Sequence, residues 1–332
     1  MKLLHITFHK GCELDIEYVF TTLGHEITVM YFTDGETVGG ELYKITHERA
    51  QKCWNKYKDY FDQFDGIITS DTCPTSRPFL QNNWSKLLII WVCNRFDYSM
   101  QNKYQDKEFY ELLRDIPNRK NVFIFGYTAF ENIYAYHYKK VQIGNLVIKP
   151  IGKNILSNNI YKSYDNNQID IFYVPTYHNE TKLMNLSEKL TQLGINNRCE
   201  RFNHISDLLF YKGGIYIPYA WSTLVFFERI QLGLVTFIPS LSFLIELFSS
   251  GDWWFQPPFH MQNTEILKFS EWYCEEHKDI LVYFNSWEDL QEKVKTTDYK
   301  AKTQNILNFA KKHHDKMLDR WNNIIIEYSK MI

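Results

Sequence analysis

The sequence has no excess of positive charge and no long uncharged apolar segment. Its 332 residues contain 37 Lys and Arg against 39 Asp and Glu, which gives a formal net charge of −2. DNA- and RNA-binding domains usually carry a basic excess, so we expect no nucleic-acid partner. The longest apolar candidate, residues 224–247, is interrupted by Glu228, Arg229, Gly233 and Pro239. A membrane-spanning helix needs about 18 uncharged apolar residues, so we expect no membrane span.

The sequence also lacks closely spaced metal ligands and disulfide candidates. Its six cysteines are widely separated, and no CxxC pair or Cys/His cluster with zinc spacing stands out. No DxD-type metal motif is present. The N-terminal stretch MKLLHITFHKG is too short an apolar run for a signal peptide and has no small-residue cleavage site. These absences predict a metal-independent, cytoplasmic protein with reduced thiols.

The chain does contain enough apolar residues for a large core, arranged as alternating short strands and helices. Hydrophobic residues make up 45% of the sequence and aromatic residues 17%. Short apolar runs that alternate with helix-like spacing are typical of βαβ units and a parallel sheet. In the first half we expect strands at 3–8, 25–32, 67–70, 86–92 and 121–125, an edge strand at 146–148, and helices at 14–23, 41–64, 104–115 and 129–138.

The alternation stops and then restarts, which predicts two domains. Residues 151–168 are polar and show little periodicity, as is typical of a linker. Strands are expected again at 169–174, 214–217, 234–238 and 280–284, with a helix at 182–193 and a long helical pattern at 299–332. We therefore predict an α/β protein with a Rossmann-like domain over 1–150, a linker over 151–168, a second Rossmann-like domain over 169–300, and a C-terminal helix over 301–332 that could pack back on the first domain.

Residues 215–247 carry the strongest functional signal. A short strand leads into a small, polar turn at Ser222 and Thr223, and a helix-like segment follows that carries one acid, Glu228, and ends at Gly233. The amides and dipole at a helix N-terminus favour phosphates, and an acid can accept hydrogen bonds from ribose hydroxyls. The segment therefore fits a nucleotide-diphosphate site, although a purely structural strand–helix–strand unit has the same pattern.

This segment resembles the donor site of GT-B glycosyltransferases, whose fold consists of two facing Rossmann-like domains. In the large sugar-nucleotide families of that fold, the donor segment reads roughly Tyr-Pro-x, a glycine- or serine-rich turn, a Glu at the helix start, and then Gly-x-Pro and a strand. The corresponding positions here are Ile217-Pro218-Tyr219, Ser222-Thr223, Glu228, Gly233-Leu234-Val235 and Pro239-Ser240. The resemblance implies that Glu228 binds the donor ribose and that Ser222 and Thr223 meet the diphosphate.

The sequence departs from the family pattern at two points. Retaining members with an E-x7-E motif carry a second acid eight positions before the ribose-binding Glu. Counted back from Glu228, that position is Ala220 here. Trp221-Ser222-Thr223 also replaces the usual glycine-rich turn. These departures leave the donor sugar undefined and leave inverting and retaining mechanisms both open.

Two further loops of the second domain have counterparts in the resembled enzymes. The loop after the first strand faces the donor diphosphate there, which implies donor contacts for Thr176, Asn179 and Lys182. The loop over residues 198–207 packs against the nucleobase there, which implies a base contact for Arg201. The alternatives are a helix cap at Asn179 and a solvated connection over 198–207.

The first domain should bind the acceptor. An inverting enzyme of this fold needs a general base, and a His or a carboxylate suits that role. Candidates lie directly after predicted strands at His9, Glu13, Asp71 and Asp97. An acid in a first helical turn also simply favours the helix dipole, so each candidate has a structural alternative.

A polar cluster after the fourth strand is a candidate acceptor site. Asn94 and Arg95 offer hydrogen bonds to sugar hydroxyls, beside an aromatic face at Phe96. The alternative is a surface pair between Arg95 and Asp97. The aromatic residues at 252–258 are interpreted as packing, because aromatic clusters are more often core than ligand-binding.

The leading interpretation is a glycosyltransferase that moves a hexose-type sugar from a UDP- or GDP-linked donor to a glycan or other hydroxyl acceptor. The resemblance implies that the nucleotide sugar is a co-substrate and that no bound cofactor or metal is needed. One alternative is a sugar-nucleotide epimerase of the same fold, against which the missing acid at Ala220 counts mildly. Another is a catalytically inactive binding protein.

Overall fold

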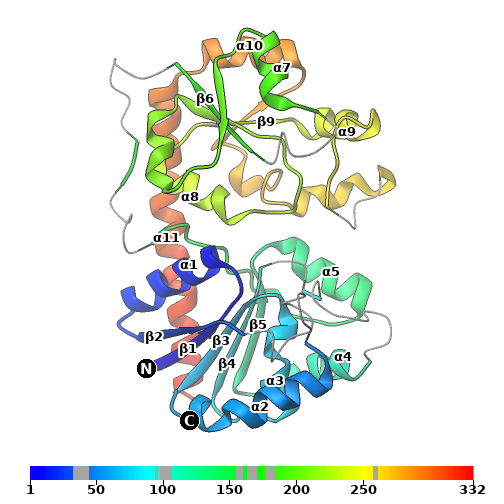
Figure 1. Cartoon of the computed structure of the whole chain (residues 1–332), viewed down its shortest axis with the longest axis vertical. Helices are drawn as coiled ribbons and strands as arrows, with labels where there is room; N and C mark the ends of the chain where they lie inside the picture. Colours follow the sequence, from blue (N-terminus) through cyan, green and yellow to red (C-terminus); the bar gives the residue numbers. More distant parts are fainter. Residues whose placement is uncertain are drawn as a thin grey trace. The chain divides into compact units, whose positions relative to one another are not determined.

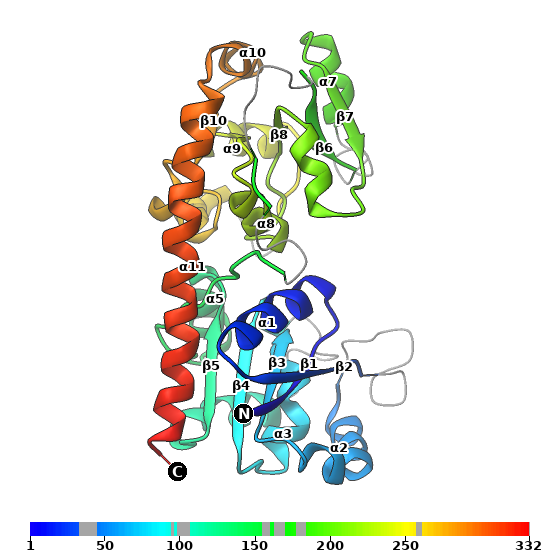
Figure 2. The same cartoon turned by 90° about the vertical axis from the view of Figure 1, so that its left-hand side faces the viewer.

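The computed structural model describes residues 1–32, 45–93, 96–97, 107–154, 160–162, 170–176, 184–256 and 261–331. The chain forms two compact units. Unit 1 comprises Met1–Ile155 and Asp315–Ile332, and unit 2 comprises Leu156–His314. The long helix α11 (Tyr299–Ser329) contributes residues to each unit and is continuous (Figures 1 and 2).

Unit 1 contains a parallel sheet of five strands in the order β2-β1-β3-β4-β5. The strands are β1 (Lys2–Ile6), β2 (Glu26–Met30), β3 (Gly66–Asp71), β4 (Leu87–Val92) and β5 (Val122–Gly126). The inner strands β3 and β4 are buried along their whole length, and β4 is an unbroken apolar run, as expected in a sheet covered on both faces. The five strands predicted for the first half are therefore confirmed.

The edge strand predicted at 146–148 is reduced to a single bridge between Gly126 and Val147. The neighbouring Ile148 carbonyl accepts a hydrogen bond from the Trp91 indole nitrogen at 2.7 Å. A side chain from the sheet thus takes the place of part of the ladder that a sixth strand would form.

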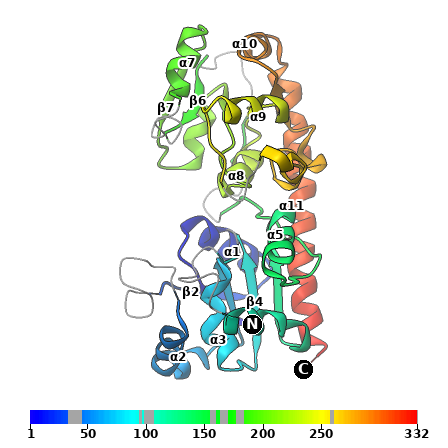
Figure 3. The same cartoon turned by 90° about the vertical axis from the view of Figure 1, so that its right-hand side faces the viewer.

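Helices cover both faces of the unit 1 sheet. They are α1 (Lys10–Thr22), α2 (His47–Phe61), α3 (Arg77–Gln81), α4 (Lys107–Arg114) and α5 (Ala129–Lys139). Figure 3 shows α2 and α3 on one side of the strands and α11 on the other. Trp321 of α11 is fully buried, and its ring lies 5.4, 5.6 and 5.8 Å from those of Phe20, Trp91 and Phe125. These edge-on aromatic contacts attach the C-terminal part of α11 to the unit 1 core.

Unit 2 contains a second parallel sheet, in the order β10-β9-β8-β6-β7. The strands are β6 (Phe172–Pro175), β7 (Asn197–Glu200), β8 (Gly213–Ile215), β9 (Thr236–Pro239) and β10 (Leu281–Phe284). The helices are α7 (Leu186–Gln192), α8 (Leu224–Leu232), α9 (Leu241–Ser249) and α10 (Trp287–Thr296). Strand β7 was not predicted, because this edge strand carries polar, partly exposed side chains instead of an apolar run.

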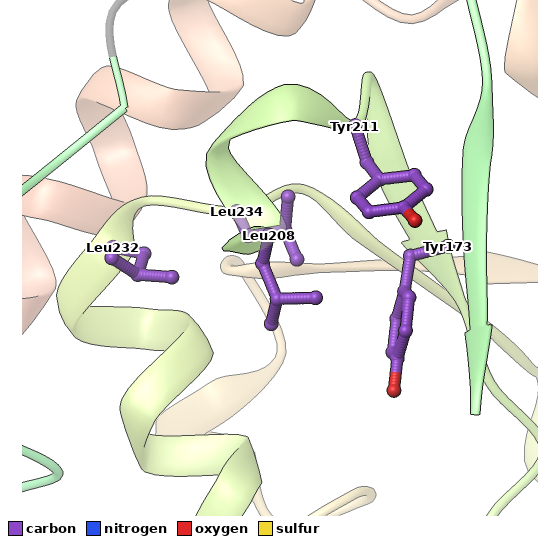
Figure 4. Close-up of a cluster of buried hydrophobic side chains, with 5 residues drawn as sticks. All are labelled: Tyr173, Leu208, Tyr211, Leu232 and Leu234. Carbon is purple, nitrogen blue, oxygen red and sulfur yellow. The ribbon is translucent and has the colours of Figure 1, made fainter. Parts of the chain in front are cut away.

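The unit 2 core includes a buried cluster of aromatic and aliphatic side chains. Its members are Tyr173, Leu208, Tyr211, Leu232 and Leu234. The rings of Tyr173 and Tyr211 lie 5.4 Å apart, and Figure 4 shows the Tyr173 hydroxyl pointing away from Tyr211. The cluster joins β6 to the carboxyl end of α8.

Helix α8 ends at a glycine that contacts α11. Gly233 has a φ of 74°, and its carbonyl accepts a hydrogen bond from the Thr303 hydroxyl at 2.8 Å. A Cβ at this position would lie only 2.9 Å from Leu307 and 3.1 Å from Thr303. Glycine is therefore required here by both the left-handed backbone and the close approach of α11.

The two sheets share one connectivity. In each, the first strand lies between the second and the third, so the connections that leave the first and third strands run in opposite directions. Ligands of such sheets bind at the carboxyl ends of the strands at this switch point. It lies between β1 and β3 in unit 1 and between β6 and β8 in unit 2. Within the described ranges, no helix is long and apolar enough to cross a membrane.

Candidate functional sites at the two switch points

Polar side chains from three elements meet at the unit 1 switch point. His9 is the N-cap of α1 and Cys12 lies in the first turn of that helix, while Asp71 ends β3 and Cys93 follows β4. The Cys12 thiol is in hydrogen-bond contact with Cys93, His9 and Ser70, and the Cys93 amide donates to the Asp71 carbonyl at 2.9 Å. Two predicted residues, His9 and Asp71, are therefore brought together.

Asp71 has the properties of a proton-transfer residue. Its φ of 76° is unusual for a residue other than glycine, and it is only 5% exposed; such strained backbone is common at functional sites. Burial, with a smaller contribution from the charge of Cys12 and an opposing one from His9, raises the pKa of Asp71 to about 7. An acid with a pKa near neutrality can exchange protons efficiently at physiological pH.

The two cysteines of this site differ in their acidity. Hydrogen bonding from Cys93, with smaller contributions from His9 and Ser70, lowers the pKa of Cys12 to about 6 against the opposing effect of burial. Desolvation raises the pKa of Cys93 well above its ordinary value. Cys93 therefore favours the thiol form, and its Sγ donates to the Trp91 carbonyl at 3.6 Å. Cys12 lies at the N-terminus of α1, a position that favours thiolates. The sequence predicts only reduced thiols here, because the positions of Cys12 and Cys93 in the chain give no sign that they meet.

His9 is exposed, and its tautomer is set by its own helix. The Gly11 amide donates to His9 Nδ1 at 3.1 Å, so neutral His9 carries its proton on Nε2. Its amide also donates to the Thr7 hydroxyl, at 3.2 Å. The hydrogen-bond contact of His9 with the Cys12 thiol therefore involves Nε2.

The remaining residues predicted for unit 1 have other environments. Glu13 accepts hydrogen bonds from Lys10 and from Tyr31 on the surface of α1. Asp97 is fully buried and is bonded by Tyr110 at 2.7 Å, Tyr134 at 3.0 Å and Lys139 at 3.0 Å. This is the environment of a structural carboxylate, so the proposal below gives Asp97 no part in the chemistry. Asn94 and Arg95 lie outside the described residues.

The unit 2 switch point is built around the loop that connects β8 to α8. Four consecutive carbonyls of this loop accept hydrogen bonds from residues 253–272, two of them from buried indole nitrogens. The bonds run from Trp253 to Pro218 (2.9 Å), from Gln256 to Tyr219 (2.7 Å), from Trp272 to Ala220 (2.8 Å) and from Glu271 to Trp221 (3.0 Å). The loop is therefore fixed by tertiary contacts, and the aromatic residue Trp253 serves packing as predicted.

The amino end of α8 is not capped by a side chain. Thr223 is the N-cap, but its hydroxyl makes no bond to the first-turn amides and instead contacts Tyr216. The buried Ser222 hydroxyl oxygen has no hydrogen-bond partner in the described part of the chain. Glu228 is half-buried one and a half turns into the helix. This end of α8 therefore offers amides and a hydroxyl to an anion.

The other predicted donor residues lie near this edge or outside the described ranges. Thr176 directly follows β6 and is half-buried, whereas Asn179 and Lys182 are not described. Arg201 and Phe202 line a cavity of about 340 Å³ beside β7 and the 3₁₀ helix at Ile205–Phe210. The lining residues are Ile171, Arg198, Glu200, Arg201, Phe202, Asn203, Asp207, Phe210 and Tyr211.

Among the described residues, one group of side chains has the composition of a metal site. Glu271, Cys274 and His277 place their ligand atoms within 4.8 Å of one another. His277 Nδ1 lies 2.8 Å from the Glu271 carbonyl oxygen, 3.2 Å from its carboxylate and 3.3 Å from Cys274 Sγ. These contacts already close the 271–277 turn by hydrogen bonding. The search for zinc spacing missed the group because a Glu and a single Cys-x2-His pair form it.

Neither a protein-family model nor a curated protein matches the sequence. Solved structures do match the fold. A protein from Listeria monocytogenes, provisionally described as a UDP-N-acetylglucosamine 2-epimerase, aligns with 100% of this chain and 98% of its own at 11% identity and a TM-score of 0.55. MnaA from S. aureus, solved with UDP, aligns over the same shares at 11% identity and a TM-score of 0.51. The calicheamicin glycosyltransferase CalG4 aligns with 98% of both chains at 8% identity and a TM-score of 0.49. The chain has the α/β fold of the GT-B class, with two parallel five-stranded sheets and a long C-terminal helix.

Proposed function

We propose that the chain is a sugar-nucleotide-dependent glycosyltransferase in which unit 2 binds the nucleotide and Asp71 of unit 1 is the general base. The observation that carries this proposal is Asp71 itself, a buried carboxyl group in strained backbone at a switch point, with its pKa raised to about 7. His9 lies at the same edge, in hydrogen-bond contact with the Cys12 thiol. Glu13 lies on the same helix and is proposed to influence this edge only through its charge.

In the proposed reaction, the Asp71 carboxylate takes the proton of an acceptor hydroxyl. The hydroxyl oxygen forms a bond to the anomeric carbon of the donor, and the bond from that carbon to the diphosphate breaks. The leaving nucleoside diphosphate gains negative charge, which the α8 amides and the Ser222 hydroxyl can stabilise. No metal is required by this scheme.

The nucleotide is proposed to bind unit 2 in three parts. Glu228 would accept hydrogen bonds from the ribose, Ser222 and Thr223 would meet the diphosphate together with the Thr176 loop, and Arg201 would contact the base in the 340 Å³ cavity. We propose UDP as the first nucleotide to test, because a structure of the same fold was solved with UDP. The acceptor is proposed to be a glycan or another hydroxyl compound.

A sugar-nucleotide epimerase is the second candidate. It is favoured by the full-length likeness to a protein described as a UDP-N-acetylglucosamine 2-epimerase. A single proton-transfer group such as Asp71 would also suit chemistry on the sugar of a bound nucleotide. This candidate would use the same nucleotide site without an acceptor.

Incubation with a panel of UDP- and GDP-sugars, with and without hydroxyl acceptors, tests the two candidates. A transferase releases the free nucleoside diphosphate in proportion to added acceptor, and Asp71→Asn abolishes the release. An epimerase converts the donor sugar without acceptor, which NMR of the sugar nucleotide detects. If sugar nucleotides bind but neither reaction occurs, the chain is a binding protein and the proposal fails.

A further inference from the structure

Unit 2 contains a buried cation that forms no ion pair with the described residues. Arg229 of α8 is only 3% exposed. Within the described ranges its guanidinium forms no ion pair, and its Nε atom has no hydrogen-bond partner. Arginine remains protonated in proteins. An unpaired charge at such depth strongly disfavours the folded state unless another group compensates it.

Aromatic rings provide part of that compensation. The guanidinium carbon lies 5.6 Å from the ring centre of Tyr173 and 5.2 Å from that of Tyr216, and Tyr173 is in hydrogen-bond contact with it. Neutral tyrosines stabilise a cation without neutralising it. The planar set of guanidinium donors suits bidentate binding of a phosphate or carboxylate. The charge of Glu228 adds a smaller stabilisation, but no described carboxylate forms an ion pair with the guanidinium.

The position of Arg229 indicates where the anion would lie. Arg229 lies in the last turn of α8, but side chains on a helix lean toward its amino end. Tyr216, whose ring contacts Arg229, lies near the N-cap residue Thr223, which affects its pKa. The guanidinium is therefore linked through Tyr216 to the uncapped amino end of α8. The unpartnered Ser222 hydroxyl lies at the same end. Amides, a hydroxyl and a guanidinium are all donors, a set that matches an anion.

We infer that Arg229 supplies the counter-charge for a phosphoryl group bound at the amino end of α8. The inference rests on the proposed function, in which a nucleoside diphosphate binds this end of the helix, and it adds a residue that the sequence did not indicate. Glu228 is adjacent in the chain, but neighbouring residues on a helix point in different directions. The acid and the base can therefore serve different parts of one nucleotide, the ribose and the phosphate.

The test compares Arg229→Met and Arg229→Lys with the wild type, with Lys278→Met, an exposed charge in the same unit, as the control. Thermal unfolding is measured with and without millimolar inorganic pyrophosphate, and the Kd of UDP is measured by calorimetry. A buried charge that awaits a ligand predicts that Arg229→Met without ligand unfolds at the wild-type temperature or above, because the uncompensated charge is gone. The variant should lose the pyrophosphate-induced rise in Tm, and its Kd for UDP should increase at least tenfold. Arg229→Lys should lie between the two, and the control should match the wild type.

Three results would overturn the inference: unchanged pyrophosphate and UDP binding in Arg229→Met, failure of both Arg229 variants to fold, or no response of the wild type to either probe. The failure of the proposed function gives a different result. If pyrophosphate stabilises the wild type through Arg229 but no sugar nucleotide is turned over, the anion site stands and the proposed function fails. If Arg229→Met turns over sugar nucleotides at the wild-type rate, the proposed function stands and the inferred role of Arg229 fails.

Discussion

The two switch points have the same strand connectivity but differ in the side chains that surround them. The edge of unit 1 brings His9 together with Asp71 and Cys12, two groups whose pKa values are shifted toward neutrality. The described residues at the edge of unit 2 offer hydrogen-bond donors for the proposed phosphate, including Ser222 and Arg229. Sheet topology therefore locates a candidate site in each unit, and the side chains on the flanking loops distinguish the proton transfer proposed for one from the anion binding proposed for the other.

The two edges also differ in how their backbone is held. Asp71 occupies a left-handed conformation that costs free energy, whereas residues 218–221 are fixed by hydrogen bonds from residues 253–272. Strain at one site and tertiary bonding at the other both restrict a loop to one geometry. We expect the first to matter for reaction rate and the second for ligand affinity.

The largest effect that tests this division is expected for Asp71→Asn. Loss of a general base reduces kcat by about 10² to 10⁴-fold, and Asn tolerates the left-handed backbone, so the fold should be kept. The Kd of UDP should not change, because the base lies in unit 1. Steady-state kinetics and calorimetry measure the two quantities, with Asp62→Asn on the surface as the control. Full activity in Asp71→Asn would show that Asp71 is not the general base and would contradict the assignment of proton transfer to unit 1.

An intermediate effect is expected for Glu228→Ala. Hydrogen bonds to a charged group contribute about 1.5 to 3 kcal/mol, so loss of the ribose contact should weaken UDP binding about 10- to 100-fold. The exposed Glu292→Ala on α10 removes the same charge elsewhere and should leave the Kd unchanged. Calorimetry with UDP and with inorganic pyrophosphate sharpens the assignment, since pyrophosphate has no ribose and should bind the variant normally. Equal loss of both ligands would mean that Glu228 supports the loop and not the ribose.

The smallest effect concerns pH. Activity should rise with pH through about 7 as Asp71 loses its proton, because the carboxylate is the form that accepts the acceptor proton. In Cys12→Ser the thiolate no longer opposes that ionisation, so the rising limb should move to lower pH, by less than the shift that burial causes. A pH–rate profile measures this, with Cys199→Ser in unit 2 as the control. If the rising limb of the pH–rate profile stays at the same pH in Cys12→Ser, the charge of Cys12 does not affect the ionisation of Asp71.

The sequence was sufficient to predict elements whose signal is local. The buried strand β4 appears as an unbroken apolar run, and the helix that carries Glu228 is bounded by Thr223 and Gly233. Strand β7 was missed because an edge strand needs no apolar run. The contact between Cys12 and Cys93 and the isolation of Arg229 between Tyr173 and Tyr216 depend on residues distant in the chain, so no local pattern could reveal them. Asp97 shows that a polar residue after a strand need not belong to a site, since its side chain can instead be hydrogen-bonded within the core.

The glycine that ends α8 couples the orientation of this helix to its contact with α11. Gly233 closely approaches Thr303 and Leu307 of α11. The amides proposed to bind phosphate lie at the opposite end of the same nine-residue helix. A side chain at position 233 would push this end away from α11 and tilt the far end by a comparable amount. Substitutions that never approach a ligand could thus alter nucleotide affinity through helix orientation alone. We therefore expect the proposed nucleotide binding to depend on the face of α11 that contacts Gly233 as well as on the loop at 216–223.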